Sequence, residues 1–300
     1  MALMYDRIMA NGLVPCGRKE INEVVSEGLA ICECFNIDSA AEIFFAKHGA
    51  GIRGFKEDNL SLKDFPNVAP VFPCMWMEFN PRIPQDYLGE TSDGYVRGQL
   101  GCLIQSMWVD DHWECYATTI QQGQHGSFLI HGIHIFDVDS QGVCEDIGIG
   151  CPPMIKEWLD RYYPSDNPDQ LQEKYLLVAS LEVIMFPCLF ALSLLHCKNV
   201  ATTDNAPNSW QQMKHARRGG KAPLVTYKTL DVGPMRQLLR NEGQSETNGL
   251  KKALHICRGH FANYDEKPLF GKYTGQFWVP AHVRGSLSEG TVMKDYRVHA

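Results

Sequence analysis

The chain contains 300 residues, carries a formal net charge of −7 and is 44% hydrophobic. This length can bury a substantial core and predicts one large or two modest domains, at about 100 to 200 residues per domain. Its eleven cysteines are irregularly spaced and lie mostly within apolar runs, which argues against a disulfide framework and favours reduced thiols in a cytosolic protein. The first fifteen residues include Asp6 and Arg7 and lack the ordered regions of an export signal.

The charge is divided unevenly along the chain. Residues 210–300 hold 15 Lys and Arg against 7 Asp and Glu, a net of +8, whereas residues 1–209 hold 13 against 28, a net of −15. A basic lobe suits a polyanion, and an acidic lobe suits a basic peptide or simply increases solubility. The composition therefore predicts two lobes that prefer partners of opposite charge.

The first half of the chain changes from helical to strand character. Residues 18–48 have apolar side chains at helical spacing and end in a glycine-rich turn, so we expect helices there. Strand patterns follow at residues 71–79, 95–108, 113–120 and 127–138. Their short connections predict an antiparallel meander, and helices near residues 154–161 and 168–197 are expected to cover one of its faces.

The apolar segment at residues 175–197 is about long enough to cross a bilayer. Glu182 near its middle and Pro187 argue against a membrane span. A buried central helix that is kinked at Pro187 and has Asn167 and Pro168 as start signals fits these residues better. We therefore expect a cytoplasmic protein without membrane association.

The second half of the chain begins with a polar segment at residues 198–223, which contains Pro207 and a glycine pair and predicts a linker or long functional loop. Strand candidates follow at residues 223–232, 253–261, 275–283 and 291–298. The expected fold is α+β, with two lobes whose mostly antiparallel sheets pack around the long apolar helix. The acidic helix-plus-meander lobe spans residues 1–209 and ends in this helix, and the basic β-rich lobe spans residues 210–300.

Histidine, arginine and aromatic side chains gather at residues 254–285. Period-two alternation places Arg258 and His260 on one face of the first strand, while His282 and Arg284 share a side of a later strand. If these strands pair, the four side chains can lie on one surface. Arginine binds phosphate, aromatic rings stack on unpaired bases, and imidazole transfers protons near neutral pH. We therefore hypothesise an RNA surface with His260 and His282 as catalytic candidates.

Other residues of the basic lobe extend this hypothesis. The candidates for RNA or phosphate binding are Arg258, Arg284, Lys272, Arg217, Arg218 and Trp278. The structural alternative is that the aromatic rings belong to the core and the cations form a solvated face. Zinc ligands are present, but no C-x-x-C pair or H-E-x-x-H run occurs, so we expect no metal and no cofactor.

The order of features near the C-terminus is specific enough to compare with a known family. His255, Arg258 and His260 are followed directly by Phe261, and then by Tyr264, a glycine-bearing turn and the sequence FWVP. Earlier in the chain come the strand PCMWMEFNP, the strand GQLGCLIQSMW and an apolar helix leading into CKNVATTDN. In this order the chain resembles a plasmid- and phage-borne family that includes a type V anti-CRISPR protein.

The resemblance implies a protein that recognises a specific peptide segment of a host protein and lowers its synthesis through degradation of the mRNA. The expected partners are a host peptide or nascent chain, with mRNA or the ribosome as a second class. Two alternatives remain open: a toxin-like, metal-independent endoribonuclease that uses the His and Arg side chains, and a peptide-binding module without RNA involvement. No catalytic motif decides whether the chain is an enzyme.

Overall fold

The computed structural model describes residues 3–14, 19–48, 61–80, 99–122, 127–150, 184–217, 223–231, 253–257, 259–269, 271–279, 282–284 and 286–291. The chain divides into two units, of which the first contains Met1–Leu195 and Thr202–Leu230 and the second contains His196–Ala201 and Asp231–Ala300. The first unit holds 17 Lys and Arg against 28 Asp and Glu, and the second holds 11 against 7. We call them the acidic unit and the basic unit.

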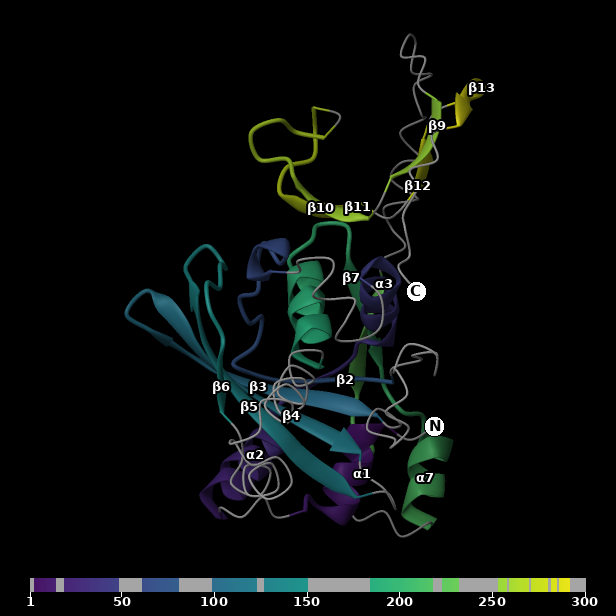
Figure 1. Cartoon of the computed structure of the whole chain (residues 1–300). Coiled ribbons are helices and arrows are strands. Elements are labelled where there is room, and N and C mark those ends of the chain that lie inside the picture. The colour runs from purple at the N-terminus through teal and green to yellow at the C-terminus, as the bar shows by residue number, and fades with distance from the viewer. Residues whose placement is uncertain are drawn as a thin grey trace, which may run out of the picture. The chain divides into compact units, whose positions relative to one another are not determined.

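A mixed sheet organises the described part of the acidic unit (Figure 1). Its strands are β1 (Glu33–Asn36), β2 (Cys74–Phe79), β3 (Leu100–Val109), β4 (His112–Gln122), β5 (Phe128–Asp139), β6 (Gly148–Gly150), β7 (Ala201–Asn205) and β8 (Tyr227–Asp231). Their order across the sheet is β6-β5-β4-β3-β2-β1-β8-β7. Successive strands from β2 to β6 pair antiparallel, which confirms the predicted meander, whereas β1 runs parallel to both β2 and β8.

Two expectations about this unit were wrong in detail. Residues 18–48 form α2 (Lys19–Ile31) and α3 (Asp38–His48), but β1 separates them, because pairing with two neighbouring strands and burial of Phe35 outweigh the local helical pattern. The expected linker at residues 198–223 contains β7 and α7 (Ser209–Arg217). The predicted boundary after residue 209 therefore does not match the observed division, since α7 and most of β8 belong to the acidic unit.

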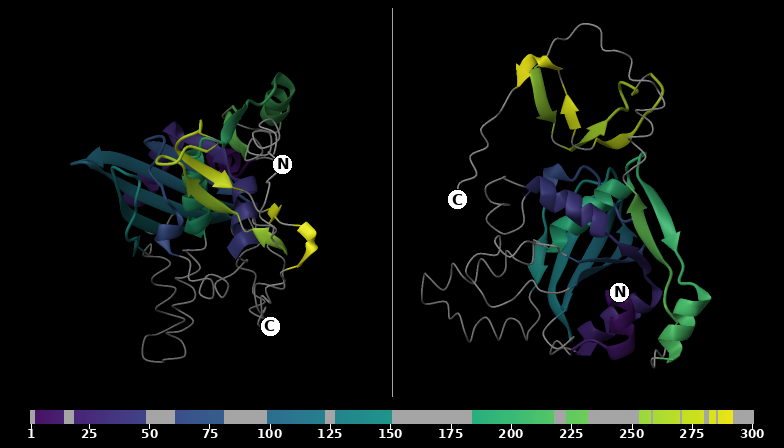
Figure 2. Two further views of the ribbon diagram at one scale, coloured as in Figure 1. Left: turned by 90° about the horizontal axis from the view of Figure 1, so that it is seen from above. Right: turned by 90° about the vertical axis from the view of Figure 1, so that its right-hand side faces the viewer.

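Helices cover both faces of the large sheet (Figures 1 and 2). On one face lie α1 (Met4–Asn11) and α2, and α2 approaches so closely that a methyl group at Gly28 would stand 2.9 Å from the Leu103 side chain. On the other face, α3 and a helix at residues 184–195 meet through the rings of Phe44 and Phe190, whose centroids are 5.7 Å apart. The short 3-10 helix η1 (Leu62–Asp64) leads into the aromatic core beside them.

The apolar segment predicted as a long central helix is described only from residue 184 onward, where it is helical to residue 195 and mostly buried. Its earlier part, the start signals Asn167 and Pro168, and the helix expected near residues 154–161 lie outside the described residues. None of the described helices is both long enough and apolar enough to cross a membrane.

The described residues of the basic unit form the short strands β9 (Ala253–Cys257), β10 (His260–Asn263), β11 (Gln276–Val279), β12 (His282–Arg284) and β13 (Ser286–Thr291). Strand β10 pairs antiparallel with β11, and β9 pairs antiparallel with β12. These pairs belong to two separate sheets, and the second sheet also includes β13, which runs parallel to β9. The segments predicted as strands at residues 253–261 and 275–283 contain β9 with β10 and β11 with β12, and the pairing between these segments that the sequence left open occurs in the described residues.

A buried carboxylate fixes the N-terminal helix to the sheet. Glu78 on β2 is 3% exposed, and its two oxygens accept hydrogen bonds from the backbone N–H groups of Met4 and Tyr5, at 3.0 and 2.9 Å, and from Trp76 Nε1, at 2.9 Å. These N–H groups of α1 have no partner within the helix, and the helix dipole favours a negative charge at this end. Glu78 therefore sets where α1 begins and how it lies on the sheet.

We predict that Glu78→Ala lowers the free energy of unfolding by ~3 kcal/mol or more, because three buried donors lose their acceptor at roughly 1 to 3 kcal/mol each. Burial raises the pKa of Glu78, although the three hydrogen bonds oppose this shift. When folding raises the pKa of a carboxyl group, that group stabilises the folded state at pH values below its unfolded pKa of about 4.3. This stabilisation is lost as the pH rises through the pKa of the folded state. In Glu78→Ala, the free energy of unfolding should no longer show this dependence on pH.

Urea unfolding at a series of pH values measures both effects. Glu114→Ala on β4 is the control, because Glu114 is only partly buried and lies in the same sheet. Equal losses of stability in the two variants would show that Glu78 does not hold α1.

Candidate functional site

The aromatic residues of the basic unit form a small core. The rings of Phe261 and Trp278 face each other across the β10–β11 pair with centroids 4.8 Å apart, and Tyr264 meets Phe277 at 5.6 Å. Phe277 and Trp278 are 2% and 1% exposed. The proposed role of Trp278 in RNA binding therefore needs correction, because a buried ring offers no face on which a base can stack. The structural alternative is the better account of this residue.

A buried asparagine holds this core in place. Asn199 donates from Nδ2 to the carbonyl oxygen of Trp278 at 2.8 Å, and its Oδ1 accepts from the Trp278 backbone N–H at 2.9 Å. The backbone N–H of Lys198 donates to the carbonyl of Gln276 at 2.8 Å. Lys198 and Asn199 therefore hydrogen-bond to the backbone of β11, as the residues of a neighbouring strand would.

The described histidine and arginine candidates lie in two different strand pairs. His260 is exposed and lies opposite Val279, whereas His282 lies opposite Cys257 and Arg284 opposite His255. Residues directly opposite each other in an antiparallel pair share a face. The pairing thus places His260 in one strand pair and His282 with Arg284 in another, and one shared surface for these residues stays a prediction.

The other predicted cations are dispersed. Lys272 is exposed, with Nζ 4.9 Å from the centroid of the Tyr273 ring, and Arg217 is exposed in the last turn of α7 in the acidic unit. Arg258 and Arg218 lie outside the described residues. Among the described residues, no three His, Cys, Asp or Glu side chains are grouped so that they could hold a metal ion.

A more coherent surface lies on the acidic unit, where the β3–β4–β5 meander extends beyond α2. Met107, Tyr116 and Ile135 are 58%, 44% and 49% exposed. The pairing aligns Met107 with Glu114 and Asp137 across the three strands, and aligns Tyr116 and Ile135 in the neighbouring row. Side chains in such rows are neighbours on one face of the sheet. We call these five residues the meander face.

The β3–β4 turn and the packing on the reverse side of these strands hold the meander face in place. The turn between β3 and β4 consists of Asp110 and Asp111, with φ of 42° and 69°, which is the signature of a tight two-residue hairpin turn. On the reverse side of the same strands, the rings of Trp108 and Trp113 pack edge to face with centroids 5.1 Å apart. The exposed apolar groups are therefore held in place before any partner binds.

The part of the chain that carries the meander face is acidic. Residues 98–155 contain no Lys or Arg, but they contain the seven acidic residues Asp110, Asp111, Glu114, Asp137, Asp139, Glu145 and Asp146. The Asp137 side chain is 71% exposed, and its Oδ1 lies 4.0 Å from Nε2 of His112. A partner that approaches the meander face meets apolar groups bordered by carboxylates.

The strands that carry the meander face were predicted from the sequence, but the surface itself was not. The signal that the sequence offered was the long interval without a Lys or Arg at residues 98–155. Neither a scan against protein-family models nor a search of curated proteins finds a match for the chain.

We predict that Asn199→Ala destabilises the basic unit by about 1 to 3 kcal/mol, because both backbone groups of Trp278 lose their buried partner. Hydrogen exchange of the β11 amides measures this loss locally, and Asn205→Ala on the exposed strand β7 is the matched control. Unchanged protection of Trp278 in Asn199→Ala would contradict the assigned role of this side chain.

Proposed function

We propose that the chain is an anti-CRISPR-like binding protein whose acidic unit recognises a specific basic and apolar peptide segment of a host protein, and which lowers the synthesis of that protein through its mRNA. The observation that carries the binding half is the meander face, whose three exposed apolar side chains lie in two neighbouring rows, one of which also contains Glu114 and Asp137. The resemblance to the plasmid- and phage-borne family motivates the mRNA half.

The composition of the meander face supports a peptide as the partner. Aromatic residues and Met are enriched where proteins bind one another, because they bury much apolar area with few rotatable bonds. Exposed apolar groups that form a contiguous patch are typical of interaction sites. The carboxylates of Glu114 and Asp137 select for Lys or Arg in the partner and repel acidic segments, so they add specificity to the apolar contact.

The basic unit supplies the support for an RNA partner. It holds 11 Lys and Arg against 7 Asp and Glu, and exposes His260 and Lys272. Phosphate contacts by exposed cations give affinity without sequence specificity. The endoribonuclease alternative places the chemistry on His260 and His282, and the binding-module alternative assigns this unit no RNA at all.

We predict that Tyr116→Ala reduces the amount of nascent host chain recovered with the protein from cells by about tenfold, because an exposed aromatic anchor at the centre of an interface commonly contributes about 1.4 kcal/mol or more. Glu114→Lys should reduce recovery similarly by repelling a basic segment. Neither change should alter the melting temperature by more than a few degrees.

Two variants outside the meander face serve as controls. Trp210→Ala removes a ring that is 61% exposed on α7, and Glu27→Lys reverses an exposed charge on α2. If recovery falls equally in the controls, or persists in Tyr116→Ala and Glu114→Lys, the meander face is not the peptide site.

We predict that the purified chain binds single-stranded RNA with an affinity that falls as salt rises, and that Lys272→Ala and Arg284→Ala each flatten the logarithmic salt slope by about 0.7. Lys19→Ala, whose side chain is 85% exposed on the acidic unit, should leave the slope unchanged. RNA cleavage in chelator that disappears in His260→Ala would select the endoribonuclease alternative. Peptide recovery with no RNA binding and no loss of transcript would select the binding module.

A further inference from the structure

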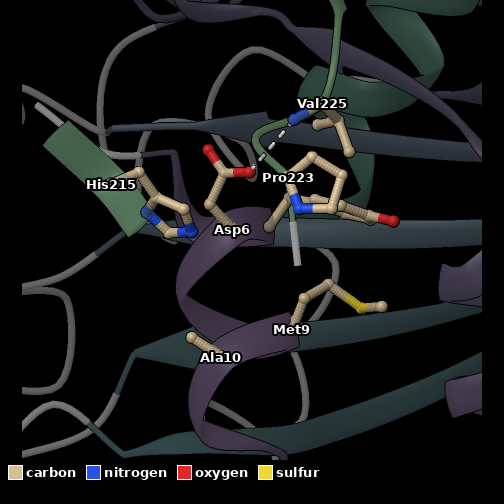
Figure 3. Close-up of a pocket in the computed structure, with 7 residues that line it drawn as sticks. Asp6, Met9, Ala10, His215, Pro223 and Val225 are labelled. Carbon is tan, nitrogen blue, oxygen red and sulfur yellow. Dashed lines mark hydrogen bonds between the residues drawn. The ribbon is translucent and has the colours of Figure 1, made fainter. Parts of the chain in front are cut away.

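A pocket of about 170 Å³ lies in the acidic unit, between α1, α7 and the segment that follows α7 (Figure 3). Its lining residues are Tyr5, Asp6, Met9, Ala10, His215, Pro223 and Val225. A cavity of about 150 Å³ is large enough to hold a molecule of the size of benzene. This pocket is built from different elements than the meander face, and nothing in the proposed function uses it.

The walls of the pocket are fixed by hydrogen bonds. Gln212 on α7 donates from Nε2 to the carbonyl of Leu224 at 2.8 Å, and its Oε1 accepts from the Leu224 N–H at 2.9 Å. On the opposite wall, Arg7 donates from Nη1 to Gln99 and Gln122 at 3.1 Å each, which attaches α1 to the sheet. The pocket is therefore a feature of the packed unit.

One carboxylate stands at the end of an otherwise mostly apolar lining. Asp6 Oδ1 accepts a long hydrogen bond of 3.4 Å from the N–H of Val225, and no hydrogen bond from the described part of the chain reaches Oδ2. Figure 3 shows His215 on the same side of the pocket as this carboxylate. Burial raises the pKa of Asp6, while the Val225 N–H and the attraction of His215 oppose the shift. A positive group placed beside Asp6 would offset the cost of burying its charge.

We infer that this pocket binds an alkylammonium or alkylguanidinium group, with the cation on Asp6 and the aliphatic stem against Met9, Ala10 and Pro223. An ammonium brings three donors and a guanidinium five, so either can satisfy Asp6 Oδ2 and still reach solvent. Long cationic side chains commonly lay an apolar stem along apolar surface while the charged end meets a polar partner. An anion in the pocket would meet the Asp6 carboxylate, which is itself part of the lining.

The direct test is a titration of the full chain with n-butylammonium chloride, followed through the labelled methyl group of Met9 by NMR. We expect a saturable shift of this signal, and binding at least about tenfold weaker for 1-butanol, which has the same stem without the charge. Asp6→Asn should remove this preference, because the amide keeps an acceptor for Val225 but loses the negative charge. Asp110→Asn is the matched control, since Asp110 lies in the exposed β3–β4 turn at a positive φ that asparagine tolerates.

A second variant keeps the inference testable if Asp6→Asn does not fold. Ala10→Leu lies at an exposed position of α1 and should block the pocket while leaving Asp6 in place. Equal shifts with n-butylammonium and 1-butanol, or binding that persists in both variants, would overturn the inference.

The same cation can belong to a free amine or to a side chain of a bound protein. Lysine capped as its N-acetyl methylamide distinguishes these two sources. Binding at least as tight as that of n-butylammonium assigns the pocket to a protein side chain, whereas exclusion of the capped lysine alone assigns it to a free amine. Both outcomes support a cation-binding pocket. Neither depends on the results for the meander-face variants Tyr116→Ala and Glu114→Lys.

Discussion

The buried carboxylate of Glu78 is the interaction on which the arrangement of the acidic unit depends. It joins the first turn of α1 to β2 and to the indole of Trp76, so one side chain sets the position of a helix and of a large core ring. The Trp76 ring in turn lies over Gly101, where a methyl group would overlap it. With α1 fixed, α1 and α2 cover the inner part of this face of the sheet, and the meander beyond them stays exposed.

Much of the acidic unit could be predicted from the sequence because its signals are local. Alternation along β3, β4 and β5 and the short turns between them are enough to predict an antiparallel meander, and helical spacing is enough to predict α2 and α3. Strand β1 could not be predicted in the same way. Its four residues become a strand only through parallel pairing with β2 and β8, and that pairing joins residues far apart in the chain.

The candidate site was harder to predict, because residue type alone does not show burial or register. Trp278 suits both a core and a stacking surface, and only its burial opposite Phe261 and beside Asn199 decides in favour of the core. His260 and His282 were predicted to share one surface from alternation alone, which does not show that their cross-strand partners are Val279 and Cys257. Glu78 and Asp6 carry no motif, since their roles arise from contacts with distant backbone groups.

The two units carry opposite excesses of charge, and the acidic one combines its charge with a firmly held apolar surface. The central claim is that this surface selects basic, apolar peptide segments. Selection from a random displayed peptide library, followed by hydrogen exchange with the enriched peptides, tests it most directly. The account predicts peptides that combine Lys or Arg with aromatic or aliphatic residues, and protection of amides in β3, β4 and β5. Enrichment of acidic peptides, or protection confined to other elements, would contradict it.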